Sequence, residues 1–165
     1  MKMNKWVPAA ILAAAAVVGL TMLSIKKLAS AKRQVHKEIL SVSLETQPAW
    51  GMEEDMERTV TTIYADGSVL REVFPCESDQ AKFTEMAWVN VDKLEPLWTV
   101  VNGNGFFSFP QEIEGVAEDG YYIHLTVETP DGIYTSGGLV ADAREDFRGI
   151  CEAFRQIAEP ALPPQ

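Results

Sequence analysis

The stretch ERTVTTIYADGSVLREVF, from Glu57 to Phe74, decides the fold that we expect for this chain. Two runs rich in threonine, valine, isoleucine, tyrosine and phenylalanine flank Asp66-Gly67 in the middle of it. β-Branched and aromatic residues favour strands, and an Asp-Gly pair accepts the positive φ angles of a tight hairpin turn. We therefore predict a β-hairpin here, whose second strand ends at Pro75.

Two further stretches alternate apolar and polar residues, as half-buried strands do. The first runs from Ile39 to Thr46 and the second from Tyr121 to Thr129. After the second, Pro130-Asp131-Gly132 predicts a turn, because proline presets the backbone there, and Ile133 to Ser136 returns as the partner strand. The apolar residues that share one face of these two strands are Leu40, Val42 and Leu44, and Ile123, Leu125 and Val127.

Two helices are expected beside these strands. Asp92-x-x-Glu95 and Asp142-x-x-Glu145 both match the capping box that begins a helix. The first helix ends at the glycines of Asn102 to Gly105, and the second runs from Asp142 to Glu159, where Pro160 ends it. Apolar residues recur at helical spacing in both, at Leu94, Leu97, Trp98 and Val101, and at Phe147, Ile150, Cys151, Phe154, Ile157 and Ala158.

The stretch from Cys76 to Asn90 leaves two options open. It holds either a short edge strand at Met86–Val89 or a loop that crosses the sheet. With the strands and helices above, this predicts an α+β fold: an antiparallel sheet of four or five strands with two helices packed on one face.

An uncharged segment of twenty residues, from Trp6 to Ile25, precedes the part of the chain that we expect to fold. A helix of that length spans roughly 30 Å, the thickness of the hydrocarbon core of a bilayer. We therefore expect a single transmembrane helix, and through it a membrane as a partner. The expected organisation is a membrane anchor over 1–27, a basic stalk over 28–38, a compact acidic α+β domain over 39–160, and a flexible tail over 161–165.

The fate of this segment and the side of the membrane are left with alternatives. Ala29-Ser30-Ala31 fits the small-x-small pattern that signal peptidase reads, but the apolar run is long for a signal peptide, so an uncleaved anchor is favoured over cleavage after Ala31. The lysines that follow the span favour a cytoplasmic domain under the positive-inside rule. The short basic head and alanine-rich run favour export, and we expect an extracytoplasmic domain.

The charge is divided between the two parts of the chain. Residues 1–40 hold seven of the 14 Lys and Arg residues and one of the 24 Asp and Glu residues, so the remainder carries a net charge of −16. Such a domain repels nucleic-acid phosphates, while the basic residues beside the span are drawn to anionic lipid head groups. The composition therefore excludes a nucleic-acid partner.

No motif in the sequence carries chemistry. A nucleophile needs a histidine base within reach, and His36 and His124 lie in no such context. His124 and Glu128 would supply only half of a metal site, and Cys76 and Cys151 are not in a metal spacing, so they form either a disulfide or two isolated thiols. We expect no catalytic residue, no metal and no cofactor.

The missing chemistry and the expected tether favour a non-catalytic binding or accessory module at a membrane surface, with a protein or peptide partner. Its candidate surface is the polar face of the strand at Tyr121–Thr129. An enzyme built around His124 or Cys76 is a further alternative. The residues of the candidate face are Tyr122, His124, Thr126 and Glu128.

The run Phe106-Phe107-Ser108-Phe109-Pro110 is either an exposed partner-binding patch or, as we favour, a cluster that fastens a helix–strand connection to the core. With its spacing to the second hairpin, it also carries a resemblance. From Thr59 to Ile157 the layout is similar to that of small bacterial membrane-anchored α+β domains of unknown function. More distantly, it resembles the emfourin family, proteinaceous inhibitors of thermolysin-type metallopeptidases. Emfourin-like inhibitors have no membrane span, and no inhibitory residue maps onto this chain; the resemblance implies peptidase inhibition as an alternative function.

Overall fold

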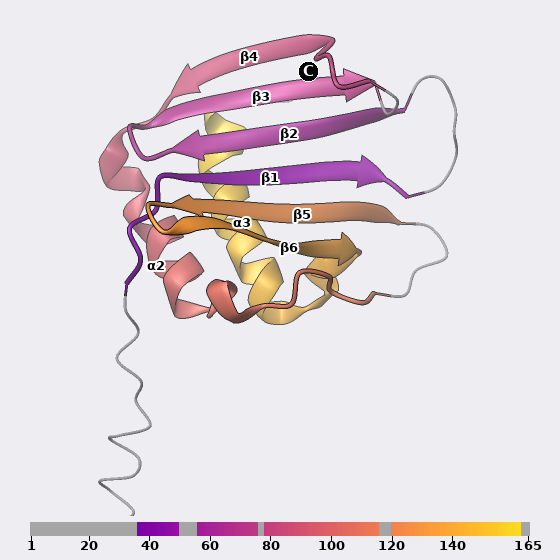
Figure 1. The fold of residues 1–165 in the computed structure, drawn as a ribbon. Helices are drawn as coiled ribbons and strands as arrows, with labels where there is room; N and C mark the ends of the chain where they lie inside the picture. The colour runs from indigo at the N-terminus through magenta and orange to yellow at the C-terminus, as the bar shows by residue number, and fades with distance from the viewer. Residues whose placement is uncertain (1–35, 50–55, 76–77, 116–119, 163–165) are drawn as a thin grey trace, which may run out of the picture. The chain divides into compact units, whose positions relative to one another are not determined.

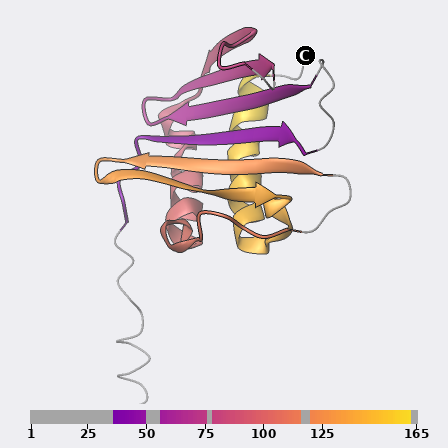
Figure 2. The same ribbon diagram turned by 45° about the vertical axis from the view of Figure 1, so that its right-hand side comes forward.

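The computed structural model describes residues 36–49, 56–75, 78–115 and 120–162. Within them the chain forms one six-stranded antiparallel sheet, in the order β4-β3-β2-β1-β5-β6. Two helices, α2 (Glu95–Gly103) and α3 (Glu145–Ala161), lie on the same face of the sheet and leave the other face open (Figures 1 and 2). The predicted α+β class, with two helices on one face, is confirmed.

The sheet has more strands than the four or five that we expect from the sequence. Its additional width comes from Phe83–Trp88, which forms a full edge strand along β3 rather than a loop. The strands are β1 (Ser41–Pro48), β2 (Glu57–Tyr64), β3 (Ser68–Pro75), β4 (Phe83–Trp88), β5 (Tyr121–Thr129) and β6 (Gly132–Leu139).

The hairpin predicted from Glu57 to Phe74 is confirmed as β2 and β3. Its turn depends on Gly67, which has a φ of 90° and whose absent Cβ would lie 2.4 Å from the backbone oxygen of Val89. Asp66 closes the turn, since its Oδ1 accepts hydrogen bonds from the backbone N–H and the hydroxyl of Ser68 at 2.9 and 2.6 Å. These bonds favour the charged carboxylate, and they lower the pKa of Asp66 below its ordinary value.

The core lies between the sheet and the helices. Strand β1 is central, because it pairs with β2 on one side and with β5 on the other. The predicted inward faces are confirmed except at Leu40, which precedes β1 and remains 38% exposed. The buried residues that the strands contribute to this core are Val42, Leu44, Ile63, Val69, Ile123, Leu125 and Val127.

The apolar stripe of α3 packs against this core, but its predicted cap is wrong. The helix begins after Arg144, and Asp146 rather than Asp142 accepts a hydrogen bond from a free backbone N–H, that of Phe147 at 3.0 Å. Asp142 lies in the short 3-10 turn η3 (Ala141–Ala143), where it accepts a hydrogen bond from the Tyr121 hydroxyl at 2.7 Å.

The far end of α3 also differs from the prediction. Pro160 lies inside the helix, which continues to Ala161, and the next residue, Leu162, is 1% exposed. The compact unit therefore includes two residues that we expect from the sequence to belong to a flexible tail. Its other boundary is His36, so the last residues of the expected stalk also belong to it.

The start of α2 shows the same kind of error. Asn90, not Asp92, provides the side-chain cap: its Oδ1 accepts a hydrogen bond from the Asp92 N–H at 3.0 Å and begins the 3-10 turn η1 (Val91–Lys93). Helix α2 follows directly, with a proline in its first turn. Gly105, with a φ of 74°, reverses the chain after the helix.

The phenylalanine cluster fastens the α2–β5 connection to the core, as we favour from the sequence. It forms the 3-10 turn η2 (Phe106–Ser108), in which Phe106 is 2% exposed. The Phe106 ring makes edge-to-face contacts with Phe107 and Phe109, at centroid distances of 5.8 and 5.7 Å. Tyr134 of β6 adds a further edge-to-face contact with Phe107.

Three expectations fall on residues outside those that the structure describes. They are the span at Trp6–Ile25, the cleavage after Ala31 and the position of Cys76. In the described part of the chain, no helix combines the length and the apolar composition that a membrane crossing requires.

Candidate functional site

The four residues of the candidate face lie on the open side of the sheet. Along β5 the buried Ile123, Leu125 and Val127 alternate with them and point toward the helices. Tyr122 is 40% exposed, Glu128 is exposed, and His124 and Thr126 are half-buried by their neighbours. The open face on which they lie extends across all six strands, well beyond the strand that the sequence singles out (Figure 1).

A row of hydroxyl groups crosses the middle of the open face. Thr135 of β6 lies opposite Thr126 of β5, and their hydroxyl oxygens are 3.0 Å apart. Ser43 of β1 is the next in register and pairs in the same way with Thr62 of β2, at 2.9 Å. We call Thr135, Thr126, Ser43 and Thr62 the hydroxyl row. Because neighbouring hydroxyls satisfy one another, the centre of the face is polar but uncharged.

The hydroxyl row ends in an apolar patch over β2, β3 and β4. Leu70 of β3 lies opposite Thr62, and Met86 of β4 lies opposite Leu70. Two residues further along their strands, Tyr64 and Trp88 lie on the same face beside them. Met86 is 63% exposed and Trp88 is 66% exposed, which is high for such large apolar side chains. The apolar patch consists of Tyr64, Leu70, Met86 and Trp88.

The sequence analysis missed the apolar patch. The alternation of Met86 and Trp88 in the segment FTEMAW would have indicated a strand with one apolar face. It would not have shown that this face points away from the core, because that depends on pairing with β3. Register separates the patch from the four residues predicted on β5 by strand β1 and, for all its members but Tyr64, by strand β2 as well.

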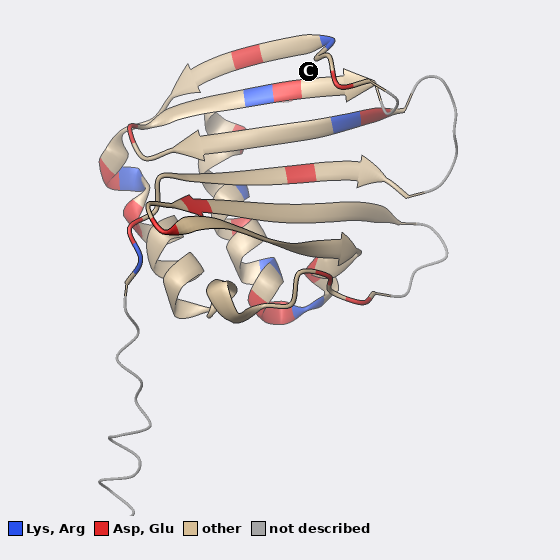
Figure 3. Ribbon diagram, viewed as in Figure 1, with Lys and Arg blue, Asp and Glu red and all other residues tan. Residues whose placement is uncertain are grey.

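Acidic groups predominate among the charges of the open face. Glu45 lies beside the hydroxyl row and forms an ion pair with Arg58 at 3.2 Å. The Arg58 guanidinium also lies over the Phe74 ring, 4.6 Å from its centroid. Glu128 accepts a hydrogen bond from the Ser41 hydroxyl at 3.2 Å. The strands carry few charges, as Figure 3 shows, and β6 carries none.

The His124 ring lies beside Tyr122 of its own strand and close to Gly137 of β6. Its ring is nearly parallel to that of Tyr122, with an interplanar angle of 6° and a centroid distance of 6.4 Å. The cross-strand residue on β6 is Gly137, whose absent Cβ would lie 2.7 Å from His124 Cδ2, so a glycine there makes room for the imidazole. On β1 the residue opposite is Glu45, which is paired with Arg58. In the described ranges, no three His, Cys, Asp or Glu side chains gather into a metal-binding group.

Cys151 is a buried free thiol in α3. Desolvation in the core raises its pKa to about 12. Since the thiolate is the nucleophilic form, this thiol is held in its unreactive state at neutral pH. Of the two cysteines considered in the sequence, Cys76 lies outside the described residues.

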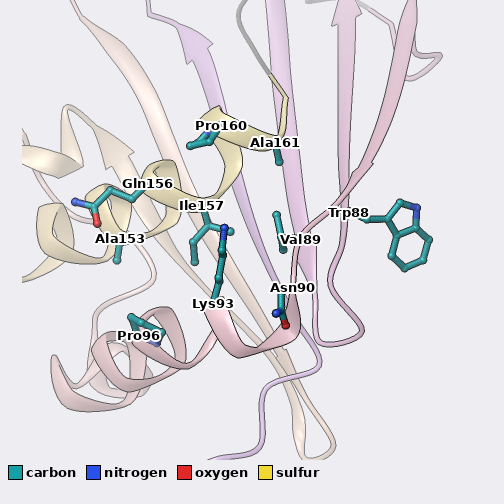
Figure 4. A pocket seen from close by; sticks show the side chains of 10 residues that line it. All are labelled: Trp88, Val89, Asn90, Lys93, Pro96, Ala153, Gln156, Ile157, Pro160 and Ala161. Atoms are coloured by element: carbon teal, nitrogen blue, oxygen red, sulfur yellow. The ribbon is translucent and has the colours of Figure 1, made fainter.

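Two hollows flank the C-terminal half of α3 on the helix side. One, of about 480 Å³, lies between α3, η1 and the end of β4, and in Figure 4 the Trp88 ring points away from it. The other, of about 620 Å³, lies between α3 and the strands β1 to β3. Its most buried cation, Arg71, donates a hydrogen bond to the Leu162 carbonyl at 2.6 Å and lies 3.6 Å from Glu85. Arg71 therefore ties the end of α3 to the sheet.

Comparison with known proteins adds no relative. Neither the scan against models of protein families nor the search of curated proteins found a match to this chain.

Proposed function

We propose that this protein is a membrane-tethered, non-catalytic binding module that holds a protein or peptide partner on the open face of its sheet. One observation carries the proposal: the uncovered face joins a polar, uncharged centre to large exposed apolar side chains at its margins. The helices occupy the other face, and no helix or strand of the described residues covers the open face (Figure 2).

The apolar patch supplies the free energy for such an interaction. Burying one large apolar side chain contributes about 1.5–3 kcal/mol. Met86 and Trp88 are both mostly exposed, so a partner that covers them would gain most of this contribution from each. Aromatic residues and methionine are enriched in the cores of protein interfaces, and tryptophan and tyrosine often supply much of the binding energy. Tyr122 provides a second aromatic side chain at the opposite side of the face.

The hydroxyl row and the acidic residues favour one kind of partner. Hydroxyl groups can exchange hydrogen bonds with a partner without the cost of desolvating a charge. Glu45, Glu72 and Glu128 face the open side, against the single cation Arg58 among the strand residues. This balance favours a neutral or basic partner, since an anionic one would be repelled.

The tether belongs to the same proposal. An anchor at Trp6–Ile25 would hold the module at a membrane, on the extracytoplasmic side as we expect, and would restrict its partners to those that share that surface. Binding then needs only modest affinity, because confinement raises the effective concentration of both partners.

The test is photo-crosslinking of the full chain in its native membrane. A photoreactive phenylalanine derivative replaces Thr126 on the open face in one variant and Glu152 on the exposed side of α3 in the control. We expect a discrete adduct from position 126 and none from position 152. The adduct should weaken at least tenfold when Trp88→Ala and Tyr122→Ala are added. Equal adducts from both positions, or none from position 126, would overturn the proposal.

A further inference from the structure

The edge strand β4 is the free edge of the sheet. It pairs with β3 on one side, and within the described residues no backbone hydrogen bond reaches its other side. Natural proteins usually protect such edges with short strands, proline, a bulge or charged side chains, lysine above all, and in β4 the one charge, Glu85, lies on the helix side beside Arg71. The segment FTEMAW contains neither proline nor lysine, and its register along β3 is continuous from Phe83 to Trp88.

The register shows which backbone groups of β4 point outward. Val89 donates to the Gly67 carbonyl at 2.9 Å, so the odd-numbered residues of β4 form the hydrogen-bonded pairs with β3. The N–H and C=O groups of Thr84, Met86 and Trp88 therefore point away from β3, toward the free side. These are also the residues whose side chains lie on the open face.

From this arrangement we propose that β4 pairs antiparallel with β4 of a second copy of this chain, about a two-fold axis that passes between the two Met86 residues. The outward N–H and C=O groups belong to Thr84, Met86 and Trp88, which are evenly spaced about Met86. A single register between the two strands therefore gives each of these groups a hydrogen-bond partner. Met86 exchanges both hydrogen bonds with Met86 of the second copy, and Thr84 does so with its Trp88. The two sheets become one antiparallel sheet of twelve strands.

The charges along β4 are compatible with this pairing. Glu85 is the only charged residue of the strand, and it lies 3.6 Å from Arg71 of its own chain. In the proposed register Glu85 is opposite Ala87 of the second copy, so the two carboxylates do not face each other. The edge therefore lacks the direct like-charge contact that would oppose a symmetric pair.

Both ends of β4 carry a base as well as acids. Glu77, Asp79 and Lys82 precede the strand in the sequence, and Asp92, Lys93 and Glu95 follow it; Lys82 also forms an ion pair with Glu57 at 2.7 Å. Antiparallel pairing brings the start of one strand toward the end of the other. Asp79 at the start of one β4 therefore lies near Lys93 of the second copy, and the acids at its end lie near Lys82 of the second copy. Although the domain is acidic as a whole, the repulsion between two copies is weakest along this edge.

The apolar patch gains from the same symmetry. A two-fold axis perpendicular to the sheet keeps both open faces on one side, and it brings the two patches together across the new strand pair. Trp88 then lies beside Thr84 of the second copy and diagonal to its Met86, within reach of a large side chain. This buries part of the two most exposed residues of the patch, Met86 and Trp88.

The other edge of the sheet limits the assembly to two copies. The segment Gln111–Ile113 lies beside Gly137 in the second half of β6, where Ile113 donates to the Gly137 carbonyl at 2.6 Å and Gly137 donates to the Gln111 carbonyl at 3.2 Å. An incoming strand cannot use these groups of Gly137. Pairing through β4 therefore closes as a dimer instead of continuing as a fibre.

The interface is small, and interfaces below about 1,200 Å² belong to weak complexes. The dimer should therefore depend on concentration, and confinement in a membrane should favour it. This inference does not rest on the proposed partner of the open face, because it is argued from the backbone edge of β4, although the side chains of Met86 and Trp88 contribute to both surfaces.

The test uses the full chain in detergent micelles, with Cys76→Ser as the background. Met86→Cys places a thiol on the two-fold axis, where hydrogen-bonded residue pairs have Cα atoms about 5.5 Å apart, within disulfide range. Thr135→Cys on β6 is the matched control, since it lies on the same face at the opposite edge. Under mild oxidation we expect a covalent dimer from Met86→Cys, at least tenfold more than from Thr135→Cys. Equal yields, or no dimer from Met86→Cys, would overturn the proposal.

A second variant tests the backbone pairing itself. Met86→Pro removes an N–H that β3 does not use, so the fold, followed by circular dichroism, should be kept. Mixing Thr84→Cys with Trp88→Cys tests the register, because these positions are opposite each other only in the proposed dimer. We expect a mixed disulfide, and its loss when Met86→Pro is added to both chains. A mixed disulfide that survives Met86→Pro, or none without it, would contradict the proposed pairing.

Discussion

The side-chain amide of Asn102 pairs with both backbone polar groups of Lys37, 65 residues earlier in the chain. Asn102 Oδ1 accepts from the Lys37 N–H at 2.9 Å, and its Nδ2 donates to the Lys37 carbonyl at 3.3 Å and to the Trp98 carbonyl at 3.0 Å. The Lys37 ammonium meanwhile lies 4.5 Å from the Tyr134 ring centroid and donates to the Tyr134 hydroxyl at 2.6 Å. The point at which the chain enters the domain is therefore fixed to α2 and β6.

Asn102→Ala should lower the free energy of unfolding by about 1–3 kcal/mol, because it leaves the partly buried N–H and carbonyl of Lys37 without the side-chain partner they have in the fold. Asn90→Ala is the control: Asn90 is exposed and makes one capping bond, so its loss should cost about 1 kcal/mol or less. Urea denaturation of both variants measures the difference. Equal losses of unfolding free energy in the two variants would show that the pairing with Lys37 stabilises the fold no more than a single capping bond does.

Gly67→Ala should destabilise the β2–β3 hairpin by about 1–3 kcal/mol, since both the positive φ and the contact with Val89 oppose a side chain. The matched control is Gly103→Ala in the last turn of α2, where a Cβ would meet nothing within 4 Å. That change should be neutral or should stabilise by up to about 1 kcal/mol. Thermal unfolding of the two variants decides the matter, and a neutral Gly67→Ala would contradict the turn described above.

Asp146 should make stability depend on pH. Hydrogen bonds from Arg144, at 2.6 and 2.8 Å, are the main cause that lowers its pKa in the folded protein. A lowered pKa stabilises the fold above the unfolded value near 4, and that contribution is lost as the pH falls through the folded pKa. The difference in unfolding free energy between the wild type and Asp146→Asn should therefore be largest near pH 7 and should shrink toward pH 2. A difference that is flat over this range would refute the assignment.

Cys151 should not react with a thiol reagent in the folded protein, because it is buried and its pKa is raised to about 12. The measurement uses the Cys76→Ser variant at pH 8, so that Cys151 is the only thiol. We expect labelling only when denaturant unfolds the domain. Labelling at the rate of a free thiol without denaturant would show that α3 opens readily.

The resemblance to the emfourin family remains a prediction with its own test. If the layout from Thr59 to Ile157 carries that function, the full chain should slow a thermolysin-type metallopeptidase at micromolar concentration. Unchanged peptide hydrolysis over that range would dispose of the alternative.

Local patterns predicted the parts of the fold that depend on local physics. The Asp66-Gly67 turn and the alternation around Ile123 are properties of short segments, and the structure confirms both. Helix caps were less predictable: Asp142 matches a capping box, but it lies in η3 and accepts a hydrogen bond from Tyr121 of β5 instead. A contact in the tertiary structure therefore engages the carboxylate that the local pattern assigns to the cap.

The wider site could be predicted only in part. Four residues of the open face follow from the alternation within β5, because that strand is long and half-buried. The hydroxyl row and the apolar patch depend on which strands pair and in what register. Ser43 meets Thr126 across 83 positions of sequence, a relation that no local pattern contains.

The most direct test of the central claim compares two adjacent tyrosines. Tyr121 and Tyr122 are each 40% exposed, but they point to opposite sides of the sheet, so one is an internal control for the other. Hydroxyl-radical footprinting, read by mass spectrometry, measures both in native membranes and in the purified full chain. A partner on the open face predicts that Tyr122 is protected in membranes while Tyr121 reacts equally in both samples. Equal reactivity of Tyr122 in the two samples would contradict the claim.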